Sequence, residues 1–239
     1  GMEILRQEAQ TAKDMGSAEL KDFKTKCLNL WSYDEKDQYI DLEKWKNCGT
    51  TKTLEKFRGK SCYCGLDLSS GGDLTSLALE FPSEDKFYLY SHSFMPKGRL
   101  QEHIESDDAP YDMWFEKGLI TLSGGKNEFK NDYKFIIKHL KDLIQNYELN
   151  IKVIGYDPHN ADAFLEDLEE LGIPLLEVTQ SAKFLNDATE DMRLNVKSET
   201  IEYDKTNEIL SWSFANAKIT SNSFGEIKID KEAKERTKR

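Results

Sequence analysis

The sequence predicts an α/β fold built on one mixed sheet, with three antiparallel strands, then parallel βαβ strands, and helices on both faces. Two observations carry this prediction. Three short apolar segments separated by turn residues, at about 61–68, 74–81 and 86–94, indicate a hairpin meander. Two later apolar segments, at about 151–156 and 174–178, alternate with helical patterns, which is typical of parallel strands joined by helical crossovers.

Residues that favour turns mark the connections between the strands of the meander. Ser69-Ser70-Gly71-Gly72 suits a hairpin between the first two strands, and Pro82 interrupts the chain before the third. Residues 96–118 are predicted to form a long connection that includes a short helix, and Gly124-Gly125 marks a turn.

Helical periodicity and capping signals recur through the second half of the chain. Asn131 or Asp132 can cap the first of these helices, and Asp187 with Glu190 resembles a capping box. Gly172 is a helix C-cap signal. We therefore expect four helices, over about 132–147, 160–171, 187–197 and 207–216, followed by a polar hairpin over 217–229.

The N-terminal quarter has a different character. Residues 2–15 are a helix candidate, residues 23–45 are rich in aromatic side chains and predict short helices and loops, and residues 46–59 read as a linker. We expect residues 1–58 to be an arm and residues 59–239 to be the main domain.

Composition narrows the class of protein. Hydrophobic residues make up 38% and charged residues 32%, which is typical of a globular protein, and no apolar run reaches the length of a membrane helix. The net charge of −11 disfavours a protein that coats DNA with a basic surface. The four cysteines lack zinc-finger spacing, and Cys62 and Cys64 are expected to face the same side of a strand as small buried hydrophobes. The acidic, mixed start of the chain predicts no secretory signal.

Two aspartates lie at or just after the ends of two predicted strands that we expect to be neighbours in the sheet. The order of elements resembles the RNase H-like fold, in which the first and fourth strands are neighbours. Asp67 ends the first of these strands and Asp157 follows the fourth. Paired carboxylates are hard oxygen ligands, so the arrangement predicts a magnesium or manganese site for phosphodiester chemistry, held by Asp67 and Asp157.

Each candidate also has a structural interpretation. Asp67 could cap the Ser69–Gly72 turn, and Asp157 could be a helix N-cap with Pro158 as the first helical residue. Asp73, across the turn from Asp67, could be a third acidic catalytic group or an ordinary turn residue. His159 could shuttle protons or simply face solvent. No Walker A pattern occurs, so the chain is not expected to be a P-loop ATPase itself.

Beyond these motifs, an ordered set of segments resembles the C-terminal nuclease part of the large terminase subunit of tailed double-stranded DNA phages. The segments that carry the resemblance are Phe23–Trp31, Gly65–Ser69 with Asp73–Thr75, Pro110-Tyr111 with Trp114 and Gly118, Gly155–Asp157, Gln180, Leu185, and Trp212–Asn216.

The resemblance implies a divalent-metal-dependent DNA endonuclease that cuts concatemeric double-stranded DNA during packaging, with two Mg²⁺ or Mn²⁺ ions in the complete site and Asp67, Asp157 and Asp73 as catalytic residues. It also implies an ATPase motor domain normally in the same chain, the portal protein and the small terminase subunit as partners, no membrane association, and the cytoplasm of the bacterial host as location. The family carries a third catalytic aspartate after a basic run like Lys234–Arg239, so the chain is expected to be truncated before its last helix.

Two alternatives stay open at this point. One is another RNase H-like nuclease, of the resolvase or transposase type, which would usually need a more basic surface. The other is a catalytically inert docking module of the packaging motor, which the absence of the third aspartate favours. Metal binding that depends on Asp67 would distinguish a nuclease from a docking module.

Overall fold

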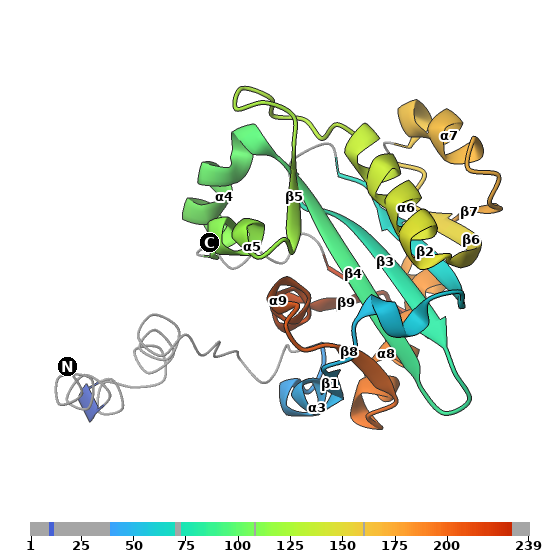
Figure 1. Ribbon diagram of the computed structural model, residues 1–239. Coiled ribbons are helices and arrows are strands. Elements are labelled where there is room, and N and C mark those ends of the chain that lie inside the picture. Colours follow the sequence, from blue (N-terminus) through green and yellow to red (C-terminus); the bar gives the residue numbers. More distant parts are fainter. Residues whose placement is uncertain (1–9, 12–38, 70–72, 108, 160, 231–239) are drawn as a thin grey trace.

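The computed structural model describes residues 10–11, 39–69, 73–107, 109–159 and 161–230. Within them, one eight-stranded mixed sheet has the strand order β1-β8-β4-β3-β2-β6-β7, with β5 paired to β4 (Figure 1). A separate hairpin is formed by β9 and β10. The strands are β1 (Gly49–Thr50), β2 (Ser61–Asp67), β3 (Thr75–Pro82), β4 (Phe87–Pro96), β5 (Ile120–Ser123), β6 (Asn150–Tyr156), β7 (Leu175–Glu177), β8 (Ile201–Asp204), β9 (Ile219–Ser221) and β10 (Ile227–Ile229).

Helices connect the strands and cover the sheet. They are α3 (Leu42–Cys48), α4 (Leu100–Asp107), α5 (Tyr111–Glu116), α6 (Lys134–Tyr147), α7 (Asp162–Glu169), α8 (Ala182–Lys197) and α9 (Glu208–Asn216), with 3-10 turns η1 (Leu54–Phe57) and η2 (Lys97–Arg99). No helix in the described part of the chain is long and apolar enough to cross a membrane.

The predicted meander and crossovers are confirmed. Strands β2, β3 and β4 pair antiparallel, while β2 with β6 and β6 with β7 pair parallel. Along β2, buried and exposed residues alternate without interruption from Ser61 to Asp67. This period-2 pattern is what a strand with one face on a core requires.

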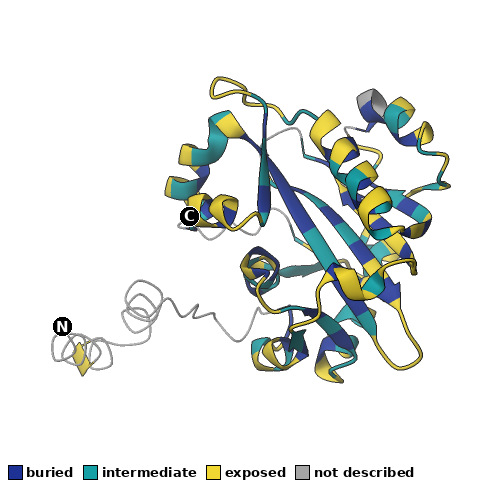
Figure 2. Ribbon diagram, viewed as in Figure 1, coloured by how far each residue is buried: buried dark blue, intermediate teal, exposed yellow. Residues whose placement is uncertain are grey.

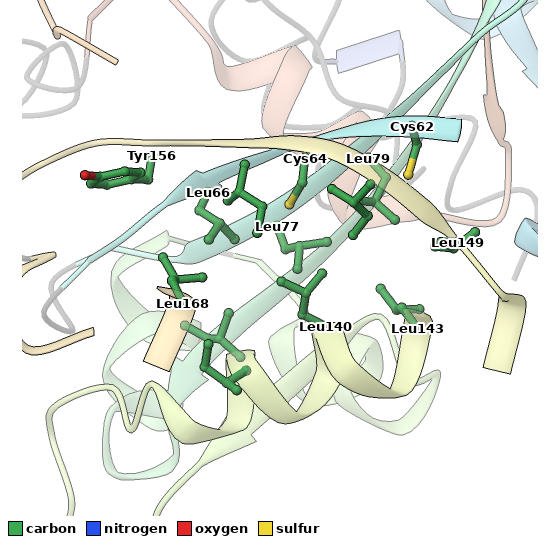
Figure 3. Close-up of a cluster of buried hydrophobic side chains, with 14 of the residues drawn as sticks. Cys62, Cys64, Leu66, Leu77, Leu79, Leu140, Leu143, Leu149, Tyr156 and Leu168 are labelled. Atoms are coloured by element: carbon green, nitrogen blue, oxygen red, sulfur yellow. The ribbon is translucent and has the colours of Figure 1, made fainter. Parts of the chain in front are cut away.

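Two apolar layers lie on opposite faces of the sheet. On the first face, Leu140 and Leu143 of α6 and Leu168 of α7 meet a row of β2 and β3 side chains (Figure 3). That row consists of Cys62, Cys64, Leu66, Leu77 and Leu79. Burial raises the pKa of Cys62 to about 11 and that of Cys64 to about 12, so both thiols stay protonated and serve as small core residues, as expected.

The second layer joins the N-terminal part of the described chain to its C-terminal helices. Trp45 of α3 stacks on Tyr203 of β8 with ring centroids 4.1 Å apart, and its ring lies 4.3 Å from that of Phe214 in α9. Val196 of α8 completes this cluster. Helices therefore pack on both faces of the sheet. In Figure 2 the central strands are largely buried or intermediate, whereas much of the helices is exposed.

Several expectations for individual segments were wrong. Residues 46–59 are not an unstructured linker, because they contain the end of α3, strand β1 and the turn η1, and β1 pairs with β8. The connection over 96–118 does include helix, as predicted, in the form of α4 and α5. Strands β5 and β8 were not predicted. Helix α8 begins at Ala182, since Ser181 caps it by accepting a hydrogen bond from the Phe184 amide at 3.2 Å.

Other expectations fall wholly or largely outside the described residues. The helix candidate over 2–15 is described only at residues 10–11, and the segment 23–45 only from residue 39 onward. The division into an arm over 1–58 and a domain over 59–239 stays a prediction.

Two stacked histidines lie between the sheet and α6. The rings of His92 in β4 and His139 in α6 are 4.2 Å apart and nearly parallel. His92 Nε2 lies 2.8 Å from Thr121 Oγ1, and His139 Nε2 lies 3.1 Å from the Tyr90 hydroxyl. Burial lowers the pKa of His92 to about 3 and that of His139 to about 4, so the native state holds both rings neutral.

This pair predicts that the protein loses stability on mild acidification. The unfolded chain binds protons at these imidazoles below about pH 6.5, whereas the folded chain does not until much lower pH. Their contribution is therefore complete above about pH 6.5 and is lost as pH falls toward 4. We expect the free energy of unfolding to fall by about 1–2 kcal/mol per imidazole between about pH 7 and 5.

Urea unfolding at several pH values would measure the effect. His139→Phe keeps an aromatic ring against His92 but removes one titrating group, so its pH dependence should be shallower. Identical pH profiles for the two proteins would contradict this account.

Candidate active site at the ends of β2 and β6

The strand register places Asp67 and Asp157 at the same edge of the sheet. Leu66 pairs with Tyr156 in the parallel β2–β6 ladder, and each of these residues immediately precedes one of the aspartates. Neighbouring strands are separated by about 4.8 Å, so the two backbones carry their carboxylates side by side. The adjacency expected of the first and fourth strands is thus confirmed; the roles of the aspartates stay predictions.

Asp67 projects from the face of β2 opposite to the core. Leu66 and Leu68 on either side are buried, whereas Asp67 is exposed and is paired across the ladder with Ser76 of β3. An exposed carboxylate at a strand end avoids the cost of burying a charge and is accessible to a cation and to a substrate.

Asp157 is half-buried and lies in a tight local turn. Its Oδ1 accepts a hydrogen bond from the His159 amide at 2.9 Å. The expectation that Asp157 caps the next helix was wrong, because α7 begins five residues later, at Asp162. The hydrogen bond of this turn nevertheless holds the Asp157 carboxylate directly after the C-terminal end of β6. His159 itself is exposed, as its structural interpretation expected.

Asp73 lies on the other side of the β2–β3 connection. Its backbone amide donates to Ser69 Oγ at 3.0 Å, and its side chain is exposed. Burial raises the pKa of the Tyr111 hydroxyl, and the Asp73 carboxylate contributes to that rise. Asp73 is thus an acidic group beside the connection, on the side that faces α5.

A clamp of neutral polar groups, formed by Thr75, Asn131 and Tyr133, holds Ser69. The Thr75 hydroxyl accepts from the Ser69 amide at 2.9 Å and donates to the Ser69 carbonyl at 3.2 Å. Asn131 Nδ2 donates to the same carbonyl at 2.9 Å and to Thr75 Oγ1 at 3.0 Å. The Tyr133 hydroxyl adds a bond of 3.4 Å. The segment before α6 thereby fixes the chain just after Asp67.

Sequence reasoning did not find this clamp. The sequence indicates Asn131 only as a possible helix cap. In the structure the residue at the cap position of α6 is Tyr133, and its side chain makes no capping hydrogen bond. The local sequence shows an Asn–Asp pair just before a predicted helix. It does not show that the Asn131 side-chain amide contacts Ser69, which lies 62 residues earlier in the chain.

The clamp predicts a measurable cost for Asn131→Ala. The substitution removes one donor from the Ser69 carbonyl, which keeps the Thr75 and Tyr133 hydroxyls, so we expect the loss of about 0.5–1.5 kcal/mol that is typical of one hydrogen bond. We expect this loss in chemical unfolding, together with weaker divalent-ion binding at the adjacent aspartates. Asn127→Ala, at an exposed position of the same connection, is the matched control. A stability equal to that of the control would show that the clamp does not contribute.

The donors at this edge fit a hard divalent cation. Carboxylate oxygens are the preferred ligands of Mg²⁺, which is usually bound by one or two carboxylates plus waters and substrate phosphates. Within the described residues no group of three or more His, Cys, Asp or Glu side chains is arranged to hold a metal. Asp67 and Asp157 stay the predicted ligands at this edge.

The fold defines a class. A mixed sheet with antiparallel and then parallel strands, covered by helices, is the RNase H-like architecture that the order of elements predicts. The family model described as "Terminase large subunit, endonuclease domain" matches residues 2–239. The chain therefore belongs to the terminase large subunit endonuclease-domain family.

Curated relatives are consistent with this membership. The large terminase subunit of Enterobacteria phage HK97 is 26% identical over 198 residues, which cover 81% of this chain and 37% of that protein. Protein YmfN of Escherichia coli K12 is 26% identical over 225 residues, which cover 90% of this chain and 48% of that protein. The chain spans less than half the length of both relatives.

Solved structures show the same fold. The crystal structure of the HK97 large terminase matches with a TM-score of 0.72 and 24% identity, covering 95% of this chain and 46% of that one. The terminase nuclease of thermophilic phage G20c with bound magnesium matches with a TM-score of 0.51 and 10% identity, covering 82% of this chain and 88% of that one. The predicted RNase H-like fold is confirmed.

Proposed function

We propose that this chain is the metal-dependent endonuclease part of a phage DNA-packaging terminase, which cuts concatemeric double-stranded DNA by two-metal hydrolysis. The observation that carries the proposal is the β2–β6 register, which brings Asp67 and Asp157 to one edge of the sheet. Family membership and the magnesium bound in the G20c nuclease support the reaction class and the type of ion.

Each residue at the edge has a distinct task. Asp67, exposed at the end of β2, would hold the divalent ions where a phosphate can approach. Asp157, fixed by the His159 amide, would contribute a ligand in a set orientation. Asp73 would add a third acidic group near the connection. Mg²⁺ or Mn²⁺ bound there would supply an activated water and stabilise the leaving oxygen.

We further propose the setting in which this reaction occurs. The substrate would be double-stranded DNA in the cytoplasm of the bacterial host, and the portal protein and small terminase subunit would be partners. An ATPase motor domain would supply translocation. The family shown by the model match favours this setting over a resolvase or transposase.

Nicking of supercoiled plasmid DNA tests the proposal. We expect the protein to convert supercoiled plasmid to open-circular and linear forms with Mn²⁺ or Mg²⁺, and to stop when EDTA removes the ion. Ca²⁺ should bind without supporting efficient cleavage, because its flexible coordination positions the reacting groups less strictly than the octahedral ions do.

Absence of cleavage with every divalent ion, by this chain and also by a version extended through the family's third aspartate, would contradict the proposal and favour the docking-module alternative. A pull-down with the portal and motor proteins would then be decisive, since binding that survives Asp67→Ala without a metal effect belongs to docking rather than to catalysis.

A further inference from the structure

Five lysines follow one another along the outer side of α6 and the connection that leads into it. This lysine strip consists of Lys126, Lys130, Lys134, Lys138 and Lys141, and every one of these side chains is exposed. Residues 126–141 contain five lysines and two acidic residues, in a chain whose net charge is −11. The strip is therefore a local reversal of the charge of the protein. Figure 2 shows the connection and the outer side of α6 as exposed.

In the described part of the chain, neither of the two acidic side chains within the strip forms an ion pair with one of its lysines. The Glu128 carboxylate lies against Gly124, where an added Cβ would come within 2.1 Å of Oε2. Asp132 Oδ1 accepts from the Lys134 amide at 3.1 Å. Among the described residues, only Lys138 of the five lysines forms an ion pair, with Asp142 at 2.6 Å. The positive charges of the strip are thus largely available to an external partner.

The strip is fixed relative to the catalytic edge. The Gly98 amide donates to the Glu128 carbonyl at 3.0 Å, and an added Cβ at Gly98 would lie only 2.5 Å from that oxygen, so only glycine allows this approach. Asn131, between Lys130 and Lys134, donates to the carbonyl of Ser69, two residues beyond Asp67. The strip therefore starts at the end of the sheet where β2 and β6 finish and continues along α6, which covers the face of the sheet opposite to the one from which Asp67 projects (Figure 1).

We propose that the lysine strip contacts the phosphate backbone of the DNA duplex on one side of the cleavage site. This inference rests on the proposed nuclease function and assigns it a binding surface. Lys134, Lys138 and Lys141 recur at helical spacing on one side of α6 and span about 10 Å of helix axis. A DNA strand presents one phosphate per about 3.4 Å of axis, so this length faces about three phosphates.

The test replaces the charge at three positions of the strip. In the variant Lys130→Gln, Lys134→Gln and Lys141→Gln, affinity for a short fluorescent duplex should fall by about tenfold or more near 0.1 M salt. The affinity for DNA falls as salt rises, and each phosphate contact makes the slope of log affinity against log salt steeper by about 0.9. Between about 50 and 200 mM NaCl, the slope of the variant should therefore be shallower by about 2–3 units.

The matched control removes the same charge at the other end of the sheet. The control variant carries Lys46→Gln, Lys86→Gln and Lys197→Gln. These three exposed lysines lie on α3, in the β3–β4 turn and on α8, respectively. The control should keep both the affinity and the salt slope of the unmodified protein. Asp67→Asn should bind DNA through the intact strip while failing to cut it.

The outcomes separate the strip from the nuclease. If the unmodified protein cuts plasmid and the strip variant and the control bind DNA with equal affinity, the proposal that the strip binds DNA is wrong. The proposed nuclease function is then unaffected. DNA binding that needs the strip, without cleavage by this chain or by the extended version under any divalent ion, would support the strip and overturn the nuclease. Absence of DNA binding by the unmodified protein would overturn both.

Discussion

Asp67→Asn should reduce metal-dependent DNA cleavage at least about a hundredfold, which corresponds to about 2.7 kcal/mol of lost transition-state stabilisation. The substitution keeps the size of the side chain and removes its charge, so the sheet should be preserved while the ligand is lost. Asp67 is exposed at the end of β2, and neither Leu66 nor Leu68 beside it can replace an oxygen ligand. The rate of plasmid nicking at saturating Mn²⁺ is the measurement.

Glu84→Gln is the matched control for this loss. Glu84 is an exposed carboxylate in the β3–β4 turn, at the opposite end of the sheet from Asp67. It should cut at the rate of the unmodified protein. Equal rates for Asp67→Asn and Glu84→Gln, in proteins of equal stability, would show that Asp67 holds no catalytic ion.

Leu140→Ala should have the largest effect on stability, a loss of about 2–5 kcal/mol. Leu140 of α6 is fully buried and points at the apolar row of β2 and β3 in Figure 3. Its removal leaves a cavity between the helix and the sheet that the close-packed core can fill only in part. Urea unfolding at neutral pH measures the change.

An exposed leucine provides the comparison. Leu176 of β7 is 52% exposed, so Leu176→Ala removes the same atoms without opening a comparable cavity. Its unfolding free energy should change by less than about 1 kcal/mol. If the two variants unfold at the same urea concentration, α6 does not close the core in the way described.

The parts of the fold that local patterns specify were predictable. Strand β2 alternates strictly between buried and exposed residues, and the predicted helix over 132–147 coincides with α6 within two residues. Such segments carry their own periodicity, because one face of each packs on a core. The adjacency of Asp67 and Asp157 followed from the order of elements rather than from any local signal.

The missed elements depend on distant partners. Strand β8 has only four residues and lies between β1 and β4, which are remote in sequence. Strand β1 has two residues and exists only through its pairing with β8. Helix α8 begins before the predicted Asp187, because the Ser181 hydroxyl accepts from the Phe184 amide and caps the helix there.

For the candidate site, the sequence points only to the acidic residues, whose roles stay predictions. Carboxylates at strand ends are recognisable in sequence, whereas the Asn131 amide that holds Ser69 reaches its partner through the tertiary fold. The same limit applies to the lysine strip, because its position beside the catalytic edge depends on the Gly98 and Asn131 contacts.

The most direct test of the central claim is the position of Mn²⁺ in crystals of this protein grown or soaked with that ion, located by its anomalous scattering. The account predicts a peak at the edge of the sheet within coordination distance of Asp67 and Asp157, and loss of that peak in Asp67→Asn. Bound Mn²⁺ elsewhere in the molecule, with both aspartates free of metal at saturating concentration, would contradict the assignment of this edge as the nuclease site.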